Sequence, residues 1–194
     1  MSMIRMLAAL AFAALALGGC ATHAYDADMR ASIDAPYRLA SGDRLRVIVF
    51  GQENLTNSFN VDGAGNISMP LIGSVRVLGL TTSETATTIG ARLRGGYIRD
   101  PKVSVEVEAF RPFFVLGEVG SSGQYPFVNG LTAQTAVAIA GGFSPRGDQS
   151  GVDVTRLVDG RPTTASVPLT FPIHPGDTVT VRERFFSEEA INLR

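Results

Sequence analysis

The sequence predicts an α+β protein built from two small modules. Two short segments are expected to be helices: residues 81–94 have helical apolar spacing, and residues 132–140 form a small apolar run. Each lies among short β-rich runs. Turn-forming residues separate these runs, since the chain contains 21 glycines and 10 prolines. A length of 194 residues allows one compact domain or two small ones. We expect the break between the modules near residues 109–111.

The first module, residues 36–109, is expected to open with a strand. The run 44–50 (RLRVIVF) is rich in β-branched residues and follows the turn Ser41-Gly42-Asp43. A second turn at 62–65 leads into the short run 66–69, and residues 72–77 have the composition of a further strand. These elements predict a small, turn-rich sheet.

A helix and a last strand complete the first module. Thr81 and Glu84 have the spacing of a capping box, in which each side chain bonds the other residue's backbone amide. Gly95-Gly96 is expected to end this helix. The run 103–108 then alternates valines with Ser104, Glu106 and Glu108, which predicts a strand with one face in water. We interpret its acidic face as solvated, although it could also line a cavity or a subunit boundary.

The second module, residues 110–184, has two strands, a helix and further strands in sequence. This order indicates the β-grasp type of α+β module. The pair around Asp159-Gly160 has the strongest hairpin signal of the chain. The expected strands are 113–119, 124–128, 152–158, 163–167 and 178–182, and the expected helix is 132–140, stopped by Gly141-Gly142.

One motif occurs twice, once in each module. Residues 39–47 resemble residues 173–181, because in both a hydrophobic residue precedes a Gly-Asp turn that leads into an alternating strand. Glycine supplies a positive φ in such a turn, and aspartate bonds its own backbone. Asp43 and Asp177 are therefore expected to be structural rather than catalytic.

The amino terminus has the pattern of a secretory signal. Arg5 precedes twelve residues without a polar side chain, which is shorter than the ~20 needed to span a bilayer. The tetrapeptide 17–20 (LGGC) resembles the bacterial lipobox, in which the cysteine is acylated and becomes the first mature residue. We expect a signal peptide over 1–19, lipid on Cys20 and a tether over 20–35, with an ordinary signal peptide and an incidental cysteine as the alternative. By the same resemblance, Ala21 after the cysteine implies the outer membrane, facing the periplasm.

Composition excludes several classes of function. Seventeen basic against eighteen acidic residues leave no excess of positive charge for nucleic acid. One cysteine and two histidines argue against disulfides, a metal site or a metal cofactor. His174 precedes a turn and is interpreted as a surface residue rather than a catalytic base, and no phosphate-binding loop is present. We predict that the protein is not an enzyme and has no cofactor.

Taken together, these motifs resemble the bacterial polysaccharide export family. Each piece is a common turn, and their order and spacing over residues 36–182 carry the resemblance. Tyr37-Arg38-Leu39 also belongs to the matching pattern. The motif positions are Gly42, Asp43, Asp62, Gly65, Pro70, Gly73, Gly79, Asp100, Pro101, Gly117, Gly123, Gly141, Gly142, Gly176 and Asp177.

The resemblance implies a fold and a function. The first module would be a polysaccharide export domain and the second a soluble-ligand-binding β-grasp (SLBB) domain. Subunits of the family form a ring that conducts polysaccharide from an inner-membrane co-polymerase toward the cell surface. Longer members add a C-terminal membrane helix, whereas residues 185–194 would span only about 15 Å as a helix. We therefore expect either that a separate outer-membrane β-barrel provides the pore or that this subunit serves only the periplasmic stage. A glycan-binding or scaffold lipoprotein without a conduit, and a periplasmic glycan hydrolase, are the alternatives.

Overall fold

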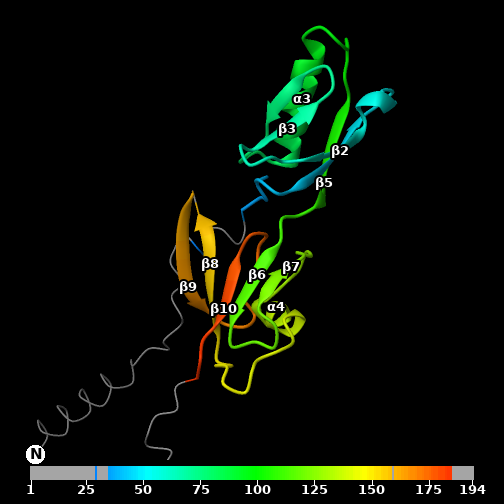
Figure 1. The fold of residues 1–194 in the computed structure, drawn as a ribbon. Coiled ribbons are helices and arrows are strands. Elements are labelled where there is room, and N and C mark those ends of the chain that lie inside the picture. The colour runs from blue at the N-terminus through cyan, green and yellow to red at the C-terminus, as the bar shows by residue number, and fades with distance from the viewer. Residues whose placement is uncertain (1–28, 30–34, 159, 185–194) are drawn as a thin grey trace, which may run out of the picture.

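The computed structural model describes residues 29, 35–158 and 160–184. They form two modules that follow one another along the long axis of the molecule, joined by the segment between β5 and β6 (Figure 1). Each module has its own buried hydrophobic cluster. The predicted signal peptide, Cys20, most of the tether, Asp159 and the tail 185–194 lie outside the described residues. Within the described part, no helix has the length and apolar character needed to cross a membrane.

The first module combines a three-stranded sheet, a hairpin and one long helix. Strand β1 (Arg44–Val49) lies between β2 (Asn57–Asn60) and β5 (Val103–Ala109) and is antiparallel to both. The separate hairpin pairs β3 (Asn66–Met69) with β4 (Gly73–Arg76). The core of the first module is formed by inward-facing side chains of the strands and of helix α3 (Thr82–Arg94). A single 3-10 turn, η1 (Glu53–Leu55), links β1 to β2.

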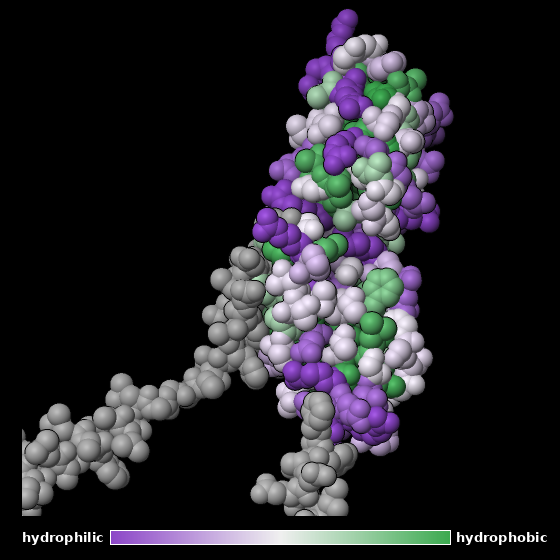
Figure 2. Space-filling model, turned by 60° about the vertical axis from the view of Figure 1, so that its left-hand side comes forward, coloured by the Kyte–Doolittle hydropathy of each residue, from purple (hydrophilic) through white to green (hydrophobic). Residues whose placement is uncertain are grey.

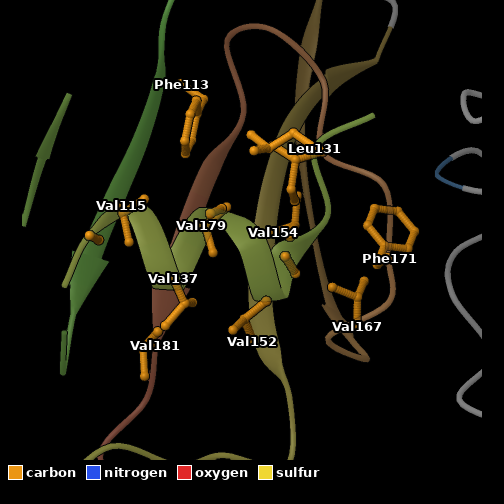
Figure 3. Close-up of a cluster of buried hydrophobic side chains, with 14 of the residues drawn as sticks. Phe113, Val115, Leu131, Val137, Val152, Val154, Val167, Phe171, Val179 and Val181 are labelled. Carbon is orange, nitrogen blue, oxygen red and sulfur yellow. The ribbon is translucent and has the colours of Figure 1, made fainter. Parts of the chain in front are cut away.

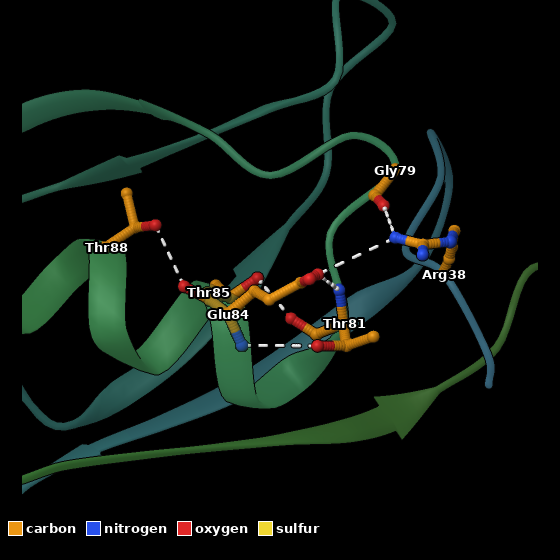
Figure 4. Close-up of polar contacts among 6 residues, drawn as sticks. All are labelled: Arg38, Gly79, Thr81, Glu84, Thr85 and Thr88. Carbon is orange, nitrogen blue, oxygen red and sulfur yellow. Dashed lines mark hydrogen bonds and ion pairs between the residues drawn. The ribbon is translucent and has the colours of Figure 1, made fainter.

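The predicted capping box at the start of α3 is confirmed (Figure 4). The Thr81 amide donates to Glu84 Oε2 over 2.7 Å, and the Glu84 amide donates to Thr81 Oγ1 over 3.2 Å. Arg38 adds a link from the preceding segment, since its Nη1 donates to the Gly79 carbonyl over 2.8 Å. The hydrogen bond from the Thr81 amide to the Glu84 carboxylate holds the pKa of Glu84 below its ordinary value. The helix therefore begins where the local sequence predicts, and Gly95 is its C-cap.

The acidic face of β5 is solvated and partly neutralised. Glu106 and Glu108 are exposed, whereas Val105 is buried and Val107, between the two glutamates, is half-buried. Glu108 forms an ion pair of 2.7 Å with Arg44 of the neighbouring β1, and Glu106 lies opposite Arg46 in the strand register. Opposite charges across neighbouring strands explain why this face tolerates two glutamates.

The second module is a mixed five-stranded sheet with one helix on it. The strands are β6 (Phe113–Gly117), β7 (Gly123–Tyr125), β8 (Val152–Val158), β9 (Arg161–Val167) and β10 (Thr178–Val181). Their order is β7-β6-β10-β8-β9, and the central pair β6 and β10, the first and last strands of the module, is parallel. Helix α4 (Ala133–Ile139) packs its apolar side on the valines of this sheet (Figure 3). The α+β class is confirmed.

Some predicted strands are shorter in the structure, for local reasons. The predicted strand 124–128 ends at Tyr125, because Pro126 has no amide to donate to a ladder. The predicted strand 113–119 ends at Gly117, whose φ of +84° leaves the extended region. The predicted strand 72–77 is reduced to residues 73–76. The predicted hairpin is present, with Val158 opposite Arg161.

Candidate functional site

The repeated Gly-Asp turn of the first module has a fully buried carboxylate. Asp43 Oδ2 accepts the Ala40 amide over 2.8 Å, which closes the turn. The hydroxyl of Tyr37 donates to the same carboxylate over 2.7 Å. The pKa of Tyr37 is raised well above its ordinary value, mainly by burial and next by the hydrogen bond to Asp43. The hydroxyl therefore keeps its proton. The aspartate thus fixes its own turn and the segment preceding it.

The turn of the second module repeats this geometry with a different partner. Asp177 Oδ2 accepts the His174 amide over 2.8 Å, at the same spacing of three residues. Arg156 of β8 donates to both carboxylate oxygens, with its Nε at 2.9 Å and its Nη2 at 2.6 Å. The Arg156 and Asp177 side chains are only 6% and 1% exposed. This bidentate pair is a buried ion pair within the second core.

Arg111, in the segment between the modules, contacts both turns. Its backbone amide donates to Asp43 Oδ1 over 2.9 Å, and its Nη1 donates to the Tyr37 hydroxyl over 3.1 Å. The Arg111 side chain also passes close to Gly176. A Cβ atom added to Gly176 would lie 2.5 Å from Arg111 Nε. The φ of +87° favours a glycine at this turn, and a larger residue would also displace the Arg111 side chain.

Three aromatic rings continue the contact between the modules. Tyr37 and Phe110 meet edge to face with ring centroids 5.0 Å apart, and Phe110 meets Phe127 in the same way at 5.4 Å. Such pairs contribute about 0.5–1.5 kcal/mol beyond their buried area. Polar and aromatic contacts thus join the first module, the connecting segment and the second module.

A cleft of about 700 Å3 lies beside these contacts. One wall of the cleft is formed by residues 35–38 and 110–111, and a second wall by residues within 127–132. The rest of the lining comes from residues 156–158 and 172–177. The volume is within the range of about 300–1,000 Å3 common for small-ligand sites. Elsewhere, on the face seen in Figure 2, hydrophobic residues are interspersed with hydrophilic ones over both modules.

His174 lines this cleft and is half-buried, whereas the sequence suggested a surface turn residue. Burial, and secondarily the positive charge of Arg156, lower the pKa of His174 below its ordinary value. The imidazole is therefore neutral at pH 7. In residues 29, 35–158 and 160–184, no three metal-ligating side chains gather at one place.

The structure brings only some of the predicted motif residues to the cleft. Gly176 and Asp177 line the cleft. Asp43 does not line it but accepts a hydrogen bond from the backbone amide of Arg111, which does. Asp62 closes the 62–65 turn by accepting the amides of Ala64 and Asn66. The others lie in turns, loops or element ends of the two modules: Gly42, Gly65, Pro70, Gly73, Gly79, Asp100, Pro101, Gly117, Gly123, Gly141 and Gly142.

Sequence reasoning missed the two arginines that organise this region. Arg156 carried a usable signal, because it falls in phase with the buried Val152 and Val154 of an alternating strand. A charge at an inward position requires a buried partner of opposite sign. Arg111 carried no such signal, since its partner Asp43 is 68 residues away.

Comparison with known proteins identifies the first module. Residues 31–108 match the family described as polysaccharide biosynthesis/export protein. The chain carries a polysaccharide export domain. The family resemblance predicted from the sequence is confirmed.

Curated relatives extend the similarity into the second module. The chain is 34% identical over 119 residues to the exopolysaccharide production protein ExoF of Rhizobium meliloti, covering 55% of this chain and 28% of that protein. It is 29% identical over 158 residues to the EPS I polysaccharide export outer membrane protein EpsA of Ralstonia solanacearum, covering 68% and 42%. It is 27% identical over 134 residues to the polysialic acid transport protein KpsD of Escherichia coli, covering 68% and 24%. The chain spans less than half of the length of these relatives.

Proposed function

We propose that this protein is a subunit of a capsular or exopolysaccharide export channel in the periplasm. The observation that carries the proposal is the match of residues 31–108 to the export family, together with relatives named for polysaccharide production, export and transport. We propose domain bounds of 36–109 and 110–184. The second would be an SLBB β-grasp domain, which is supported by a helix packed on a mixed sheet with a parallel central pair.

The proposed location is the periplasmic side of the outer membrane, with a lipid anchor on Cys20. Support comes from the basic start, the short apolar run and the lipobox-like residues 17–20. The names of the EpsA relatives include the words outer membrane protein. A single acyl chain gives marginal membrane binding, whereas the several chains of a bacterial lipoprotein give stable anchoring.

The proposed assembly is a homo-oligomeric ring that receives polysaccharide from an inner-membrane co-polymerase. Each module is filled by its own core, so residues 35–158 and 160–184 of one chain do not enclose a conduit for polymer. A closed ring with heterologous contacts is the simplest way for such subunits to surround one. A separate outer-membrane β-barrel would then provide the pore. The cleft between the modules supports a second candidate, a glycan-binding lipoprotein without a conduit.

Deletion of the gene is expected to abolish surface polysaccharide and leave polymer in the periplasm. The measurement is polysaccharide content in the medium, on the cell surface and in the periplasm, with a plasmid-borne copy as the control. A pure binding protein would leave secretion near the level of the parent strain. Unchanged secretion would therefore contradict the export role, and shortened chains on incubation with purified protein would support a hydrolase.

Replacing Cys20 with serine is expected to release the protein from the membrane fraction. The serine hydroxyl is not acylated by the lipoprotein pathway, so the proposed anchor is lost. Palmitate labelling and fractionation measure the effect, with Ser2→Ala as a control within the same signal region. Label on the Cys20→Ser protein, or unlabelled protein that stays in the membrane, would contradict the anchor.

A further inference from the structure

The cleft presents an arginine whose donors are only partly used. Arg111 lines the cleft and its side chain is 28% exposed. Its Nη1 donates to Tyr37, while its Nε and Nη2 make no hydrogen bond to any residue that the structure describes. The nearest carboxylate, Asp43, lies 3.8 Å from Nη1 and already accepts bonds from Tyr37, the Ala40 amide and the Arg111 amide. The guanidinium therefore has capacity for a further acceptor.

The charge of the cleft favours an anion. Its described lining includes three arginines and one acidic residue, Asp177. Arg156 is paired with Asp177, and Arg38 lies 3.7 Å from Glu84, so Arg111 is the arginine left to meet an anion. Asp177 is fully engaged by Arg156 and by its own turn. A bound anion would thus meet positive charge without meeting a free carboxylate. Arginine is also the side chain whose planar donors match a carboxylate in a bidentate arrangement.

The other walls fit a sugar ring. The half-buried rings of Phe110 and Phe127 lie beside Arg111 and give apolar surface against which the C–H face of a pyranose can pack. Asn129 is exposed on the loop before α4. Its side-chain amide can donate hydrogen bonds to sugar hydroxyls and accept hydrogen bonds from them. A few polar groups beside apolar walls is the usual composition of a small-ligand site.

We propose that this cleft binds a carboxylate-bearing sugar residue of the polymer, with the carboxylate on Arg111 and the ring against Phe110 and Phe127. The proposal rests on the proposed function, since polysaccharide is the substrate that brings such a residue to the protein. It makes the junction of the modules a point of contact with acidic polymers. Neutral saccharides lack the group that Arg111 recognises and would bind more weakly.

The test is a titration of the full chain with trigalacturonic acid, followed by calorimetry and by amide NMR shifts. Maltotriose is the neutral probe, and hexaglutamate tests an acidic peptide. We expect trigalacturonic acid to bind and to shift the amides of Gly130 and Gly176, and Arg111→Gln to weaken binding about tenfold or more. Phe127→Leu, which leaves the polar contacts of Arg111 in place, is expected to weaken binding as well. The matched control is Arg99→Gln, which removes the same charge. Arg99 is an exposed arginine of the first module that does not line the cleft.

The outcomes separate this inference from the export role. Equal affinity for trigalacturonic acid and maltotriose, equal effects of Arg111→Gln and Arg99→Gln, or no binding would overturn the sugar site. Tighter binding of hexaglutamate would replace the sugar by an acidic peptide segment. Any of these results, together with loss of secretion on gene deletion, leaves the export role intact. Binding as expected with unchanged secretion overturns the export role alone.

Discussion

Replacing Asp177 with alanine is expected to lower the free energy of unfolding of the second module by about 3–5 kcal/mol. The substitution leaves the Arg156 guanidinium, whose side chain is only 6% exposed, without its bidentate carboxylate partner. It also removes the acceptor for the His174 amide, so the turn before β10 is weakened. Because β10 is the central strand of its sheet, the loss affects the whole module.

Urea unfolding followed by circular dichroism measures this effect. Glu183→Ala is the control, because it breaks an ion pair with Arg146 whose side chains are 63% and 51% exposed. An exposed pair contributes about 0–1 kcal/mol, so the control is expected to unfold near the parent midpoint. The double substitution Arg156→Met/Asp177→Ala removes the uncompensated charge and is expected to recover part of the loss. Equal midpoints for Asp177→Ala and Glu183→Ala would show that the buried pair is not a main source of stability.

Local patterns in the sequence predicted the elements, because their causes lie within a few residues. Thr81 and Glu84 satisfy each other's amides at a spacing of three, and the alternation of 103–108 separates buried from exposed faces. Helix α4 is also capped locally, by Thr132 and Thr135. Its start would have been predictable from the same spacing, with threonine in place of the usual glutamate.

The site was less predictable, because its contacts join distant parts of the chain. Asp43 and Arg111 are 68 residues apart, and Arg156 and Asp177 are 21 apart. The sequence did predict that both aspartates close Gly-Asp turns, but the turn motif does not indicate burial or a partner. Two copies of one motif thus have two different arginine contacts, one at the module junction and one inside a core. The repeat identified the positions, and only the fold shows that Arg111 contacts both turns.

Replacing Gly117 with alanine is expected to destabilise the second module by about 1–3 kcal/mol more than replacing Gly142 with alanine. The two glycines have nearly the same positive φ, +84° and +81°, so both substitutions carry a backbone cost. At Gly142 a Cβ meets no atom within 4 Å. At Gly117 a Cβ would lie 2.1 Å from the Val181 carbonyl oxygen, a separation that no relaxed structure tolerates.

The clash at Gly117 is difficult to relieve, because the carbonyl it meets is fixed. Val181 lies opposite Gly117 in the parallel β6–β10 pair, and its oxygen accepts the Glu118 amide over 3.0 Å. Moving the oxygen away from a methyl group would break this bond at the end of the β6–β10 pair. Urea unfolding of the two alanine variants measures the difference. Midpoints that agree within error would mean that β6 and β10 separate easily, which is incompatible with a rigid central pair in the second module.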